Sequence, residues 1–470
     1  MKTVNAQTIT ETIAHLCIDA NRNLPKDVAA ALHQAEETEP FAPARDLLSL
    51  LTKNEQIART TQMPICQDTG MAVVFADVGQ DVHIAGNFAE AVNEGVRRGY
   101  VEGLLRKSVV GDPLRRVNTG DNTPAVLHTR LVPGDTLTLT VAPKGFGSEN
   151  MSQLRMLTPA SGIDGVKRFV LDTVRAAGAN PCPPMVLGIG IGGDFEQVAE
   201  NAKRALMLPL GTPNPDPFYA QLEEELLEAI NQTGIGVQGL GGRTTCLGLH
   251  IIAAPTHIAG LPVAVNVSCH VAPRDGGAVM GGTHMRKLTT PLTEDDVKSL
   301  HAGDHVLLSG VVYTARDAAH LRMMDLIRAG KPLPVDLAGQ VIYYAGPTPT
   351  PPGRPVGSIG PTTSTRMDSS TPTLLQHGLR GMIGKGSRSP AVMAAMQEYP
   401  AVYFAAVGGA AALMAECVTS LEVICWDDLG PESVKRLTLK DLPLVVAADC
   451  YGQDAFTLGQ RAYLEGQNEA

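Results

Sequence analysis

Short apolar segments that alternate with amphipathic helical segments constrain the fold of this 470-residue chain more than any other feature. Runs such as Met71–Ala76, Met185–Gly190 and Gln340–Ala345 have the length and continuity of buried strands. Phe195–Leu206 carries apolar residues at helical spacing and predicts an amphipathic helix directly after one of these strands. Residues 1–60 are predicted to be mostly helical. The alternation of strands and helices is typical of α/β or α+β folds.

A stretch of small and flexible residues near residue 280 divides the chain. Residues 276–283 contain four glycines in eight positions, a composition suited to a linker. A chain of this length exceeds one ordinary domain, and each part is long enough to bury a core. We therefore predict two domains, residues 1–280 and 281–470. The residues from Ala462 onward are predicted to be a polar tail.

Composition excludes several classes of function. The net charge of −10 and the pI near 5.7 argue against a nucleic-acid partner, so an anionic substrate must be drawn by local arginines and lysines. No run of 18 apolar residues predicts a membrane span. The amino terminus lacks the apolar core of a signal peptide and the arginine pattern of a transit peptide. These absences predict a cytoplasmic protein.

The eight cysteines are too sparse for a disulfide scaffold, and none forms a C-x-x-C pair. A lone cysteine is most often a buried free thiol, so spacing alone does not diagnose a metal. Three cysteines nevertheless lie beside a turn or at the end of an apolar strand, where functional residues gather. Their contexts are Cys66–Gly70, Asn180–Pro184 around Cys182, and Pro262–His270 around Cys269. Cys17, Cys417 and Cys425 lie in apolar segments and are interpreted as packing residues.

The glycine-rich segments predict close backbone approach to a small inorganic group or to neighbouring elements better than they predict a nucleotide site. Gly188–Gly193 fits neither the dinucleotide fingerprint nor a P-loop, and Gly239–Thr245 lacks the Lys-Ser/Thr pair. Ser358–Asp368 combines hydroxyls, an arginine and a carboxylate, a set that suits a turn around a carboxylate ligand. Gly384–Arg388 could form a nest of backbone N–H groups beside a lysine. The alternative for Ser358–Asp368 is a surface loop with a helix cap.

Eight segments in order resemble the class I, iron–sulfur fumarate hydratases, which are related to two-subunit L-tartrate dehydratases. The resemblance covers about residue 10 to residue 455, with α-type and β-type parts fused in one chain. Two departures stand out: Phe146 replaces a glycine of the family motif, and Cys246 replaces an alanine. The segments are Met63–Gly70, Lys107–Thr123, Pro143–Asn150, Gly188–Gly193, Gly241–Thr245, Thr314–His320, Gly360–Asp368 and Gly381–Gly386.

The resemblance implies a cofactor and a two-part architecture. It implies that Cys66, Cys182 and Cys269 hold a 4Fe–4S cluster with one open iron, which would make the protein oxygen-sensitive. An N-terminal mixed α/β cluster domain would face a C-terminal swivelling β/β/α-type domain. A cleft between the two would take the substrate. The implied substrate-binding residues are Gln67, Arg106, Gly147, Arg316, Thr363, Arg366 and Lys385.

The resemblance also assigns the proton transfers. It points to Thr362 as the base for the C3 proton of malate, which requires nearby positive charge to stabilise the alkoxide. Asp68 and His257 are similar to the family's pair that handles the proton of the leaving hydroxyl. The sequence around His257 would by itself fit an ordinary capping or core histidine.

The predicted activity is the reversible hydration of fumarate to L-malate, a step of the tricarboxylic acid cycle, with the open iron as Lewis acid. A sister dehydratase acting on L-tartrate or mesaconate is the main alternative. A non-catalytic iron–sulfur sensor is a remote one, since the polar segments of the second half would then have no task. The predicted partners are a small dicarboxylate and a second copy of the chain, in a homodimer.

Overall fold

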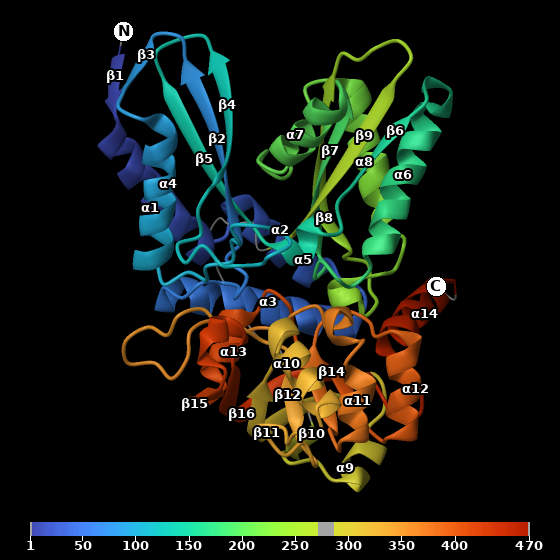
Figure 1. The fold of residues 1–470 in the computed structure, drawn as a ribbon. Helices are drawn as coiled ribbons and strands as arrows, with labels where there is room; N and C mark the ends of the chain where they lie inside the picture. The colour runs from blue at the N-terminus through green and yellow to red at the C-terminus, as the bar shows by residue number, and fades with distance from the viewer. Residues whose placement is uncertain (1, 271–285, 469–470) are drawn as a thin grey trace.

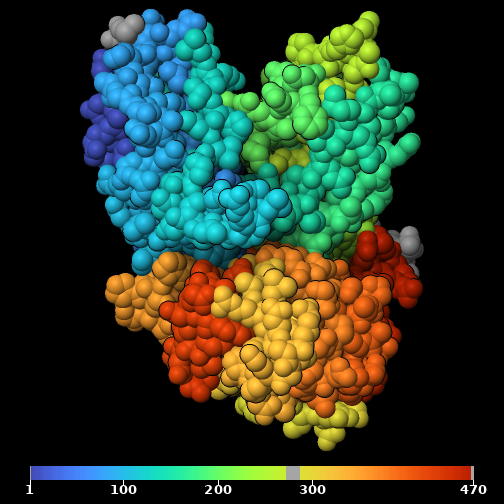
Figure 2. Space-filling view, in the orientation of Figure 1, coloured from blue at the N-terminus to red at the C-terminus, as the bar shows by residue number. Residues whose placement is uncertain are grey.

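The computed structural model describes residues 2–270 and 286–468. These residues form two lobes side by side and a third body beneath them (Figure 1). The lobes are separated by a hollow that opens away from the third body (Figure 2). The predicted linker at 276–283 and the predicted boundary between residues 280 and 281 lie outside the described residues.

The first lobe is a three-stranded sheet covered by two long helices. The strand order is β4-β2-β5, with β2 parallel to β4 and antiparallel to β5. Helices α1 and α4 pack closely because α4 carries Gly95 and Gly99, where a Cβ would come within 2.7 Å of Ile13 and Cys17. The elements are β1 (Lys2–Asn5), α1 (Ala6–Arg22), β2 (Met71–Gly79), β3 (Val82–Ala85), α4 (Phe88–Glu102), β4 (Val126–Val132) and β5 (Leu137–Lys144).

The second lobe is a four-stranded sheet of order β6-β9-β7-β8, in which β7 runs parallel to β8 and antiparallel to β9. Glycines in β7 let α7 lie directly on the strand: a Cβ at Gly188 or Gly190 would fall within 2.1 Å of α7 carbonyl oxygens. Close helix packing thus explains the glycine-rich segment. The elements are α5 (Phe146–Glu149), β6 (Gln153–Leu157), η1 (Pro159–Ser161), α6 (Gly162–Ala177), β7 (Met185–Gly192), α7 (Phe195–Ala205), α8 (Pro217–Asn231), η2 (Val237–Gly239), β8 (Cys246–Ala254) and β9 (Leu261–Cys269).

The third body is a sheet that closes on itself. Its strand order is β10-β11-β12-β13-β14-β16-β15, and an additional β11–β16 pairing joins the two sides. The elements are β10 (Arg286–Thr289), α9 (Glu294–Lys298), β11 (His305–Thr314), α10 (Asp317–Arg328), β12 (Val341–Tyr343), η3 (Ser364–Met367), α11 (Thr371–Gln376), β13 (Gly381–Gly384), α12 (Pro390–Glu398), β14 (Val402–Ala405), α13 (Ala411–Glu416), β15 (Val418–Cys425), η4 (Asp427–Glu432), β16 (Val434–Ala448) and α14 (Ala455–Asn468).

Helix α3 (Ala42–Thr61) joins the bodies. It lies between the lobes and the third body (Figure 1), pairs with α2 (Lys26–Thr38) and contacts α13. Leu48 and Leu51 of α3 share one continuous buried core with the inner strands of the third body. That shared core docks the third body firmly against the first half of the chain.

The predicted mixed α/β class and the helical start are confirmed. The predicted polar tail is wrong, because α14 continues through Ala462 to Asn468. Tyr463 explains the difference: its side chain is buried and its ring meets that of Phe41 edge to face at 5.9 Å. Across the described ranges, we find no helix with the length and apolarity that crossing a membrane demands.

Candidate functional site

A cavity where the three bodies meet brings together every predicted site residue except His257. The first lobe, the second lobe and the third body each contribute side chains to its wall. These residues lie between positions 66 and 385 of the sequence, so only folding brings them together. The predicted residues that line the cavity are Cys66, Gln67, Asp68, Arg106, Gly147, Cys182, Cys269, Arg316, Thr362, Thr363, Arg366 and Lys385.

Cys66 lies in the turn between α3 and β2. Gln62, which follows the last residue of α3, has a left-handed conformation with φ 57° that redirects the chain toward the cavity. The third body fixes the turn, since Ser358 Oγ donates to the Pro64 carbonyl at 2.5 Å and the Gln67 side chain donates to the Pro361 carbonyl at 3.1 Å. The thiol is therefore placed by contacts from both halves of the chain.

Cys182 and Cys269 lie at the same end of the second sheet. Cys269 is the last residue of β9 and stands opposite Met185, the first residue of β7. Cys182 comes just before β7, at φ 58°, a conformation that non-glycine residues adopt rarely and mostly at constrained sites. Lys385 Nζ from the third body lies 2.7 Å from the Cys182 sulfur.

The three thiols line one cavity without forming a site for a single metal ion. In residues 2–270 and 286–468, no three His, Cys, Asp or Glu side chains converge closely enough to share one ion. A cluster makes no such demand, because each thiolate binds a different iron. Glycine also avoids a clash with one thiol, as a Cβ at Gly408 would lie 2.2 Å from the Cys182 sulfur. Burial, with the nearby Cys269 and Asp68, raises the pKa of the Cys66 thiol to about 12, so a metal that bound there would have to displace its proton.

Asp68 is held as a carboxylate by surrounding cations. Its Oδ1 accepts from Arg106 Nη2 at 2.8 Å, and its Oδ2 accepts from the Phe146 backbone N–H at 3.2 Å. Burial raises the pKa of Asp68, but Arg106, Lys385 and Arg316 outweigh burial and hold the pKa below its ordinary value. The Asp68 side chain in the cavity is therefore an ionised carboxylate.

Thr362 and Lys385 lie on neighbouring backbone segments. The Lys385 N–H donates to the Thr362 carbonyl at 3.2 Å, and Thr363 forms a bridge with Lys385. Burial lowers the pKa of Lys385, but Cys182, Cys66 and Cys269 raise it more, so the ammonium group stays charged. A side chain at Gly147 would come within 3.0 Å of Lys385 Nζ, which explains why a glycine suits that position.

Two further arginines from the third body complete a positive wall. Arg316 is buried and pairs with Glu432 at 3.1 Å. Arg366 binds Asp317 through two nitrogens, with Nε 2.8 Å from Oδ1, and its side chain is 42% exposed. With Arg106 and Lys385, the cavity thus offers four cationic side chains. Such a set suits a small dianion, which needs at least two charge-assisted grips.

His257 is the predicted site residue that the structure leaves outside the cavity. It lies in the exposed turn between β8 and β9, where its Nδ1 accepts from the Ala259 N–H at 3.2 Å. That turn lies at the end of the second lobe remote from the third body (Figure 1). Its proton-handling role stays a prediction that this chain's own cavity does not support.

Some lining residues carry no sequence signal of their own. Asn21, Ser268 and the pair Gly408–Gly409 line the cavity but were not singled out. Of these, only the glycine pair, which follows the apolar run at 401–407, could have suggested a close backbone approach. Asn21 comes from α1, more than forty residues before the first predicted ligand.

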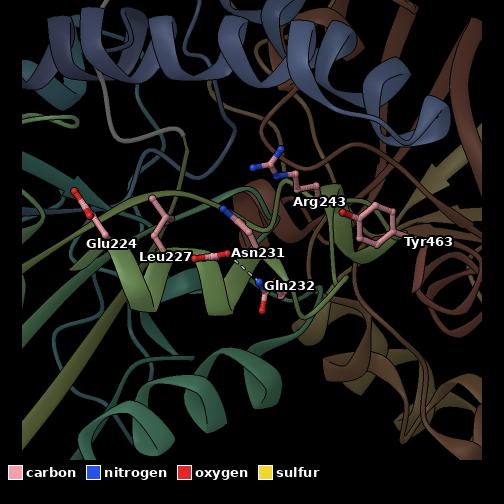
Figure 3. A pocket seen from close by; sticks show the side chains of 7 residues that line it. Glu224, Leu227, Asn231, Gln232, Arg243 and Tyr463 are labelled. Carbon is pink, nitrogen blue, oxygen red and sulfur yellow. Dashed lines mark hydrogen bonds between the residues drawn. The ribbon is translucent and has the colours of Figure 1, made fainter. Parts of the chain in front are cut away.

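A second depression, of about 510 Å³, lies between α8 and α14 (Figure 3). None of the predicted site residues lines it. Gln232 and Glu228 are hydrogen-bonded to each other there, and Asn231 of the same helix lies beside them. Its residues are Glu224, Leu227, Glu228, Asn231, Gln232, Arg243 and Tyr463.

Two family models together cover nearly the whole chain. The model described as fumarate hydratase (Fumerase) matches residues 10–278, and the model described as fumarase C-terminus matches residues 273–459.

Individual relatives agree with these models. The chain is 33% identical to the anaerobic class I fumarate hydratase of Escherichia coli, covering 92% of this chain and 85% of the relative. It is 30% identical to the mitochondrial fumarate hydratase 1 of Leishmania major, covering 86% and 82%. A protein of Methanocaldococcus jannaschii described as an alpha subunit of L(+)-tartrate dehydratase is 40% identical, covering 56% of this chain and 94% of the relative.

Proposed function

The chain belongs to the class I fumarate hydratase family and is a hydro-lyase, and from this premise we propose that it converts fumarate reversibly to L-malate in the three-body cavity. One observation carries the proposal: the cavity combines three cysteines with four cationic side chains and an ionised carboxylate. A dicarboxylate matches that charge pattern in size and sign. The cysteines come from the first two bodies and three of the cations from the third.

We propose Cys66, Cys182 and Cys269 as the residues that would hold a 4Fe–4S cluster. When bound, the cluster supplies a Lewis acid for the hydroxyl of malate. The arrangement supports this assignment in three ways. The thiols line one cavity, the glycine at position 408 avoids a clash with the Cys182 sulfur, and the Lys385 cation offsets thiolate charge.

The chain's own residues would bind the dianion and move two protons. Arg106, Arg316, Arg366 and Lys385 bind the carboxylates, while Gln67 and Thr363 add hydrogen bonds. Thr362 takes the C3 proton of malate, and neighbouring positive charge lowers the cost of its alkoxide. Asp68, ionised in the free site, holds the proton exchanged with the hydroxyl group.

A sister dehydratase remains the second candidate because of the relative described as a tartrate dehydratase subunit. Only the first part of this chain takes part in that match, while the fumarate hydratases match both parts. We therefore propose fumarate ahead of tartrate as the substrate. The homodimer and the cytoplasmic location stay predictions.

The activity can be tested on anaerobically purified enzyme by following the ultraviolet absorbance of fumarate. We expect rapid loss of fumarate with formation of L-malate, and much slower turnover of L-tartrate and mesaconate under the same conditions. Faster turnover of either alternative would make the sister dehydratase the correct assignment. An enzyme with full iron content that turns over none of the three would overturn the proposal.

The pH dependence of the reaction tests the role of Asp68. Arg106→Met removes the cation 2.8 Å from its carboxylate, so the pKa of Asp68 rises and the carboxylate accepts a proton at higher pH. We expect the acid limb of kcat/KM for fumarate hydration to move to higher pH. Arg130→Met, which breaks a surface ion pair, should leave the limb in place. An unmoved limb in Arg106→Met would mean that another group titrates.

A further inference from the structure

Two buried carboxamides hold a single glycine turn of the third body against two cysteine loops. The turn is Gly408–Gly409, between β14 and α13. The carboxamides are Asn54, from the middle of α3, and Gln238, from η2. Asn54 is fully buried and Gln238 is 6% exposed. Neither lines the cavity, and neither belongs to the substrate-binding or ligand set.

Gln238 fastens the loop of Cys182. Its amide nitrogen donates to the Pro183 carbonyl at 3.0 Å and to the Gly408 carbonyl at 3.2 Å. Its amide oxygen accepts from the Gly408 N–H at 2.8 Å. Its backbone N–H also donates to the Pro183 carbonyl at 2.7 Å, and its φ is 57°. A non-glycine residue in this conformation indicates that the side chain is held in place by its surroundings.

Asn54 makes the equivalent set of bonds to the loop of Cys66. Its amide nitrogen donates to the Ile65 carbonyl at 3.2 Å and to the Gly409 carbonyl at 2.8 Å. Its amide oxygen accepts from the Leu413 N–H at 2.9 Å. The Ala411 N–H adds a direct bond to the Ile65 carbonyl at 3.2 Å. Each carboxamide thus bridges the peptide next to a cysteine and the same glycine turn.

The glycine turn leaves little freedom for the Cys182 loop. A Cβ at Gly408 would lie 2.2 Å from the Cys182 sulfur and 3.2 Å from the Gln238 amide oxygen. The turn therefore touches the thiol itself while its polar groups are held by the two carboxamides. The loops of Cys66 and Cys182 are both held to the same glycine turn, so the position of that turn fixes the distance between the two cysteines.

We propose that Asn54 and Gln238 are positioning residues that set the spacing of Cys66 and Cys182 through the Gly408–Gly409 turn. Docking of the third body then holds the iron–sulfur site closed against loss of iron. The inference rests on the proposed function for the identity of the bound group. It goes beyond that function by assigning retention of the group to two residues outside the cavity.

Isosteric variants test the proposal. Asn54→Asp and Gln238→Glu keep the shape but replace an amide donor that serves two carbonyl groups. We expect each anaerobically loaded variant to release iron to a chelator about tenfold faster than the wild type, since buried carbonyl groups lose their partners. The double variant should release iron more slowly than the product of the two single-variant accelerations predicts, because both residues hold the same turn. If a carboxylate variant fails to fold, Asn54→Leu or Gln238→Met takes its place.

A matched control separates positioning from general destabilisation. Asn231, visible in Figure 3, also clamps backbone: its amide nitrogen donates to the Cys246 carbonyl at 3.1 Å and its oxygen accepts from Thr245 and Cys246. Asn231→Asp should lower the melting temperature of the iron-free protein as the test variants do, yet release iron at the wild-type rate.

The outcomes distinguish the two proposals. If the wild type holds iron and the Asn54 and Gln238 variants release it at the wild-type rate, the positioning role is wrong and the proposed function stands. Equal acceleration in Asn231→Asp would likewise overturn the positioning role, since any destabilisation would then suffice. If the anaerobically loaded wild type holds no iron, the proposed cluster site fails and the positioning role fails with it.

Discussion

Cys182→Ser should leave the enzyme with little iron and nearly no activity. A serine oxygen is a harder and shorter ligand than a thiolate, and iron–sulfur clusters are held by cysteine thiolates. The Cys182 sulfur has no room to move, with Gly408 packed against it, Lys385 Nζ 2.7 Å away and its backbone at φ 58°. We expect the same loss in Cys66→Ser and Cys269→Ser. Iron and sulfide analysis of anaerobic protein, with the fumarate assay, measures both effects.

Cysteines outside the cavity provide the controls. Cys425→Ser changes a half-buried thiol at the end of β15 and should keep full iron content and activity. Cys17→Ser places a hydroxyl in the fully buried α1–α4 contact, so it should lower stability but keep the iron. Full iron content in Cys182→Ser would contradict the ligand assignment.

Thr362→Ala should reduce kcat by about 10²–10⁴, the usual range for a positioned acid–base group, with little change in substrate affinity. The structure supports a distinct role for each of the two adjacent threonines. Thr362 is buried, with its N–H bonded to the Tyr344 carbonyl at 2.7 Å, whereas Thr363 is only partly buried. Side chains of successive residues in extended backbone point to opposite sides. Thr363→Ala should therefore act mainly on KM, as a lost hydrogen bond to a carboxylate would.

Deuterium exchange gives the more direct readout for the base. Thr362→Ala with normal iron content should still bind malate but fail to exchange the C3 proton with deuterated solvent. Exchange at the wild-type rate would place the base elsewhere, with Asp68 as the first candidate. Thr363→Ala serves as the matched control, because it should exchange normally once malate is saturating.

The local pattern of apolar residues was sufficient to predict several central strands of the fold. The strands β2, β7 and β9 were predicted because each is a continuous apolar run beside turn residues. Two of the cysteines were singled out because they flank β7 and β9. The predicted residues line one cavity because their segments lie at the ends of strands and helices, where functional loops come together.

Contacts between distant segments could not be predicted from local pattern. Asn54 donates a hydrogen bond to the Gly409 carbonyl, which lies 355 residues later in the sequence. An asparagine inside an amphipathic helix gives no indication of such a partner. The C-terminal helix was missed because its composition is polar, and burial of Tyr463 against Phe41 decides its state. His257 was assigned by resemblance alone, and it lies in the exposed turn between β8 and β9, two strands that are not neighbours in the sheet.

The closure of the third sheet has a consequence for the order in which the protein is completed. Strand β11 pairs with β16, which begins at Val434, so the ring cannot close until β16 has left the ribosome. Pairings between strands so far apart in sequence also form slowly. The three cysteines are made long before that, within the first 269 residues. A newly made chain therefore carries its three cysteines without the closed third body until β16 has been synthesised and has paired with β11.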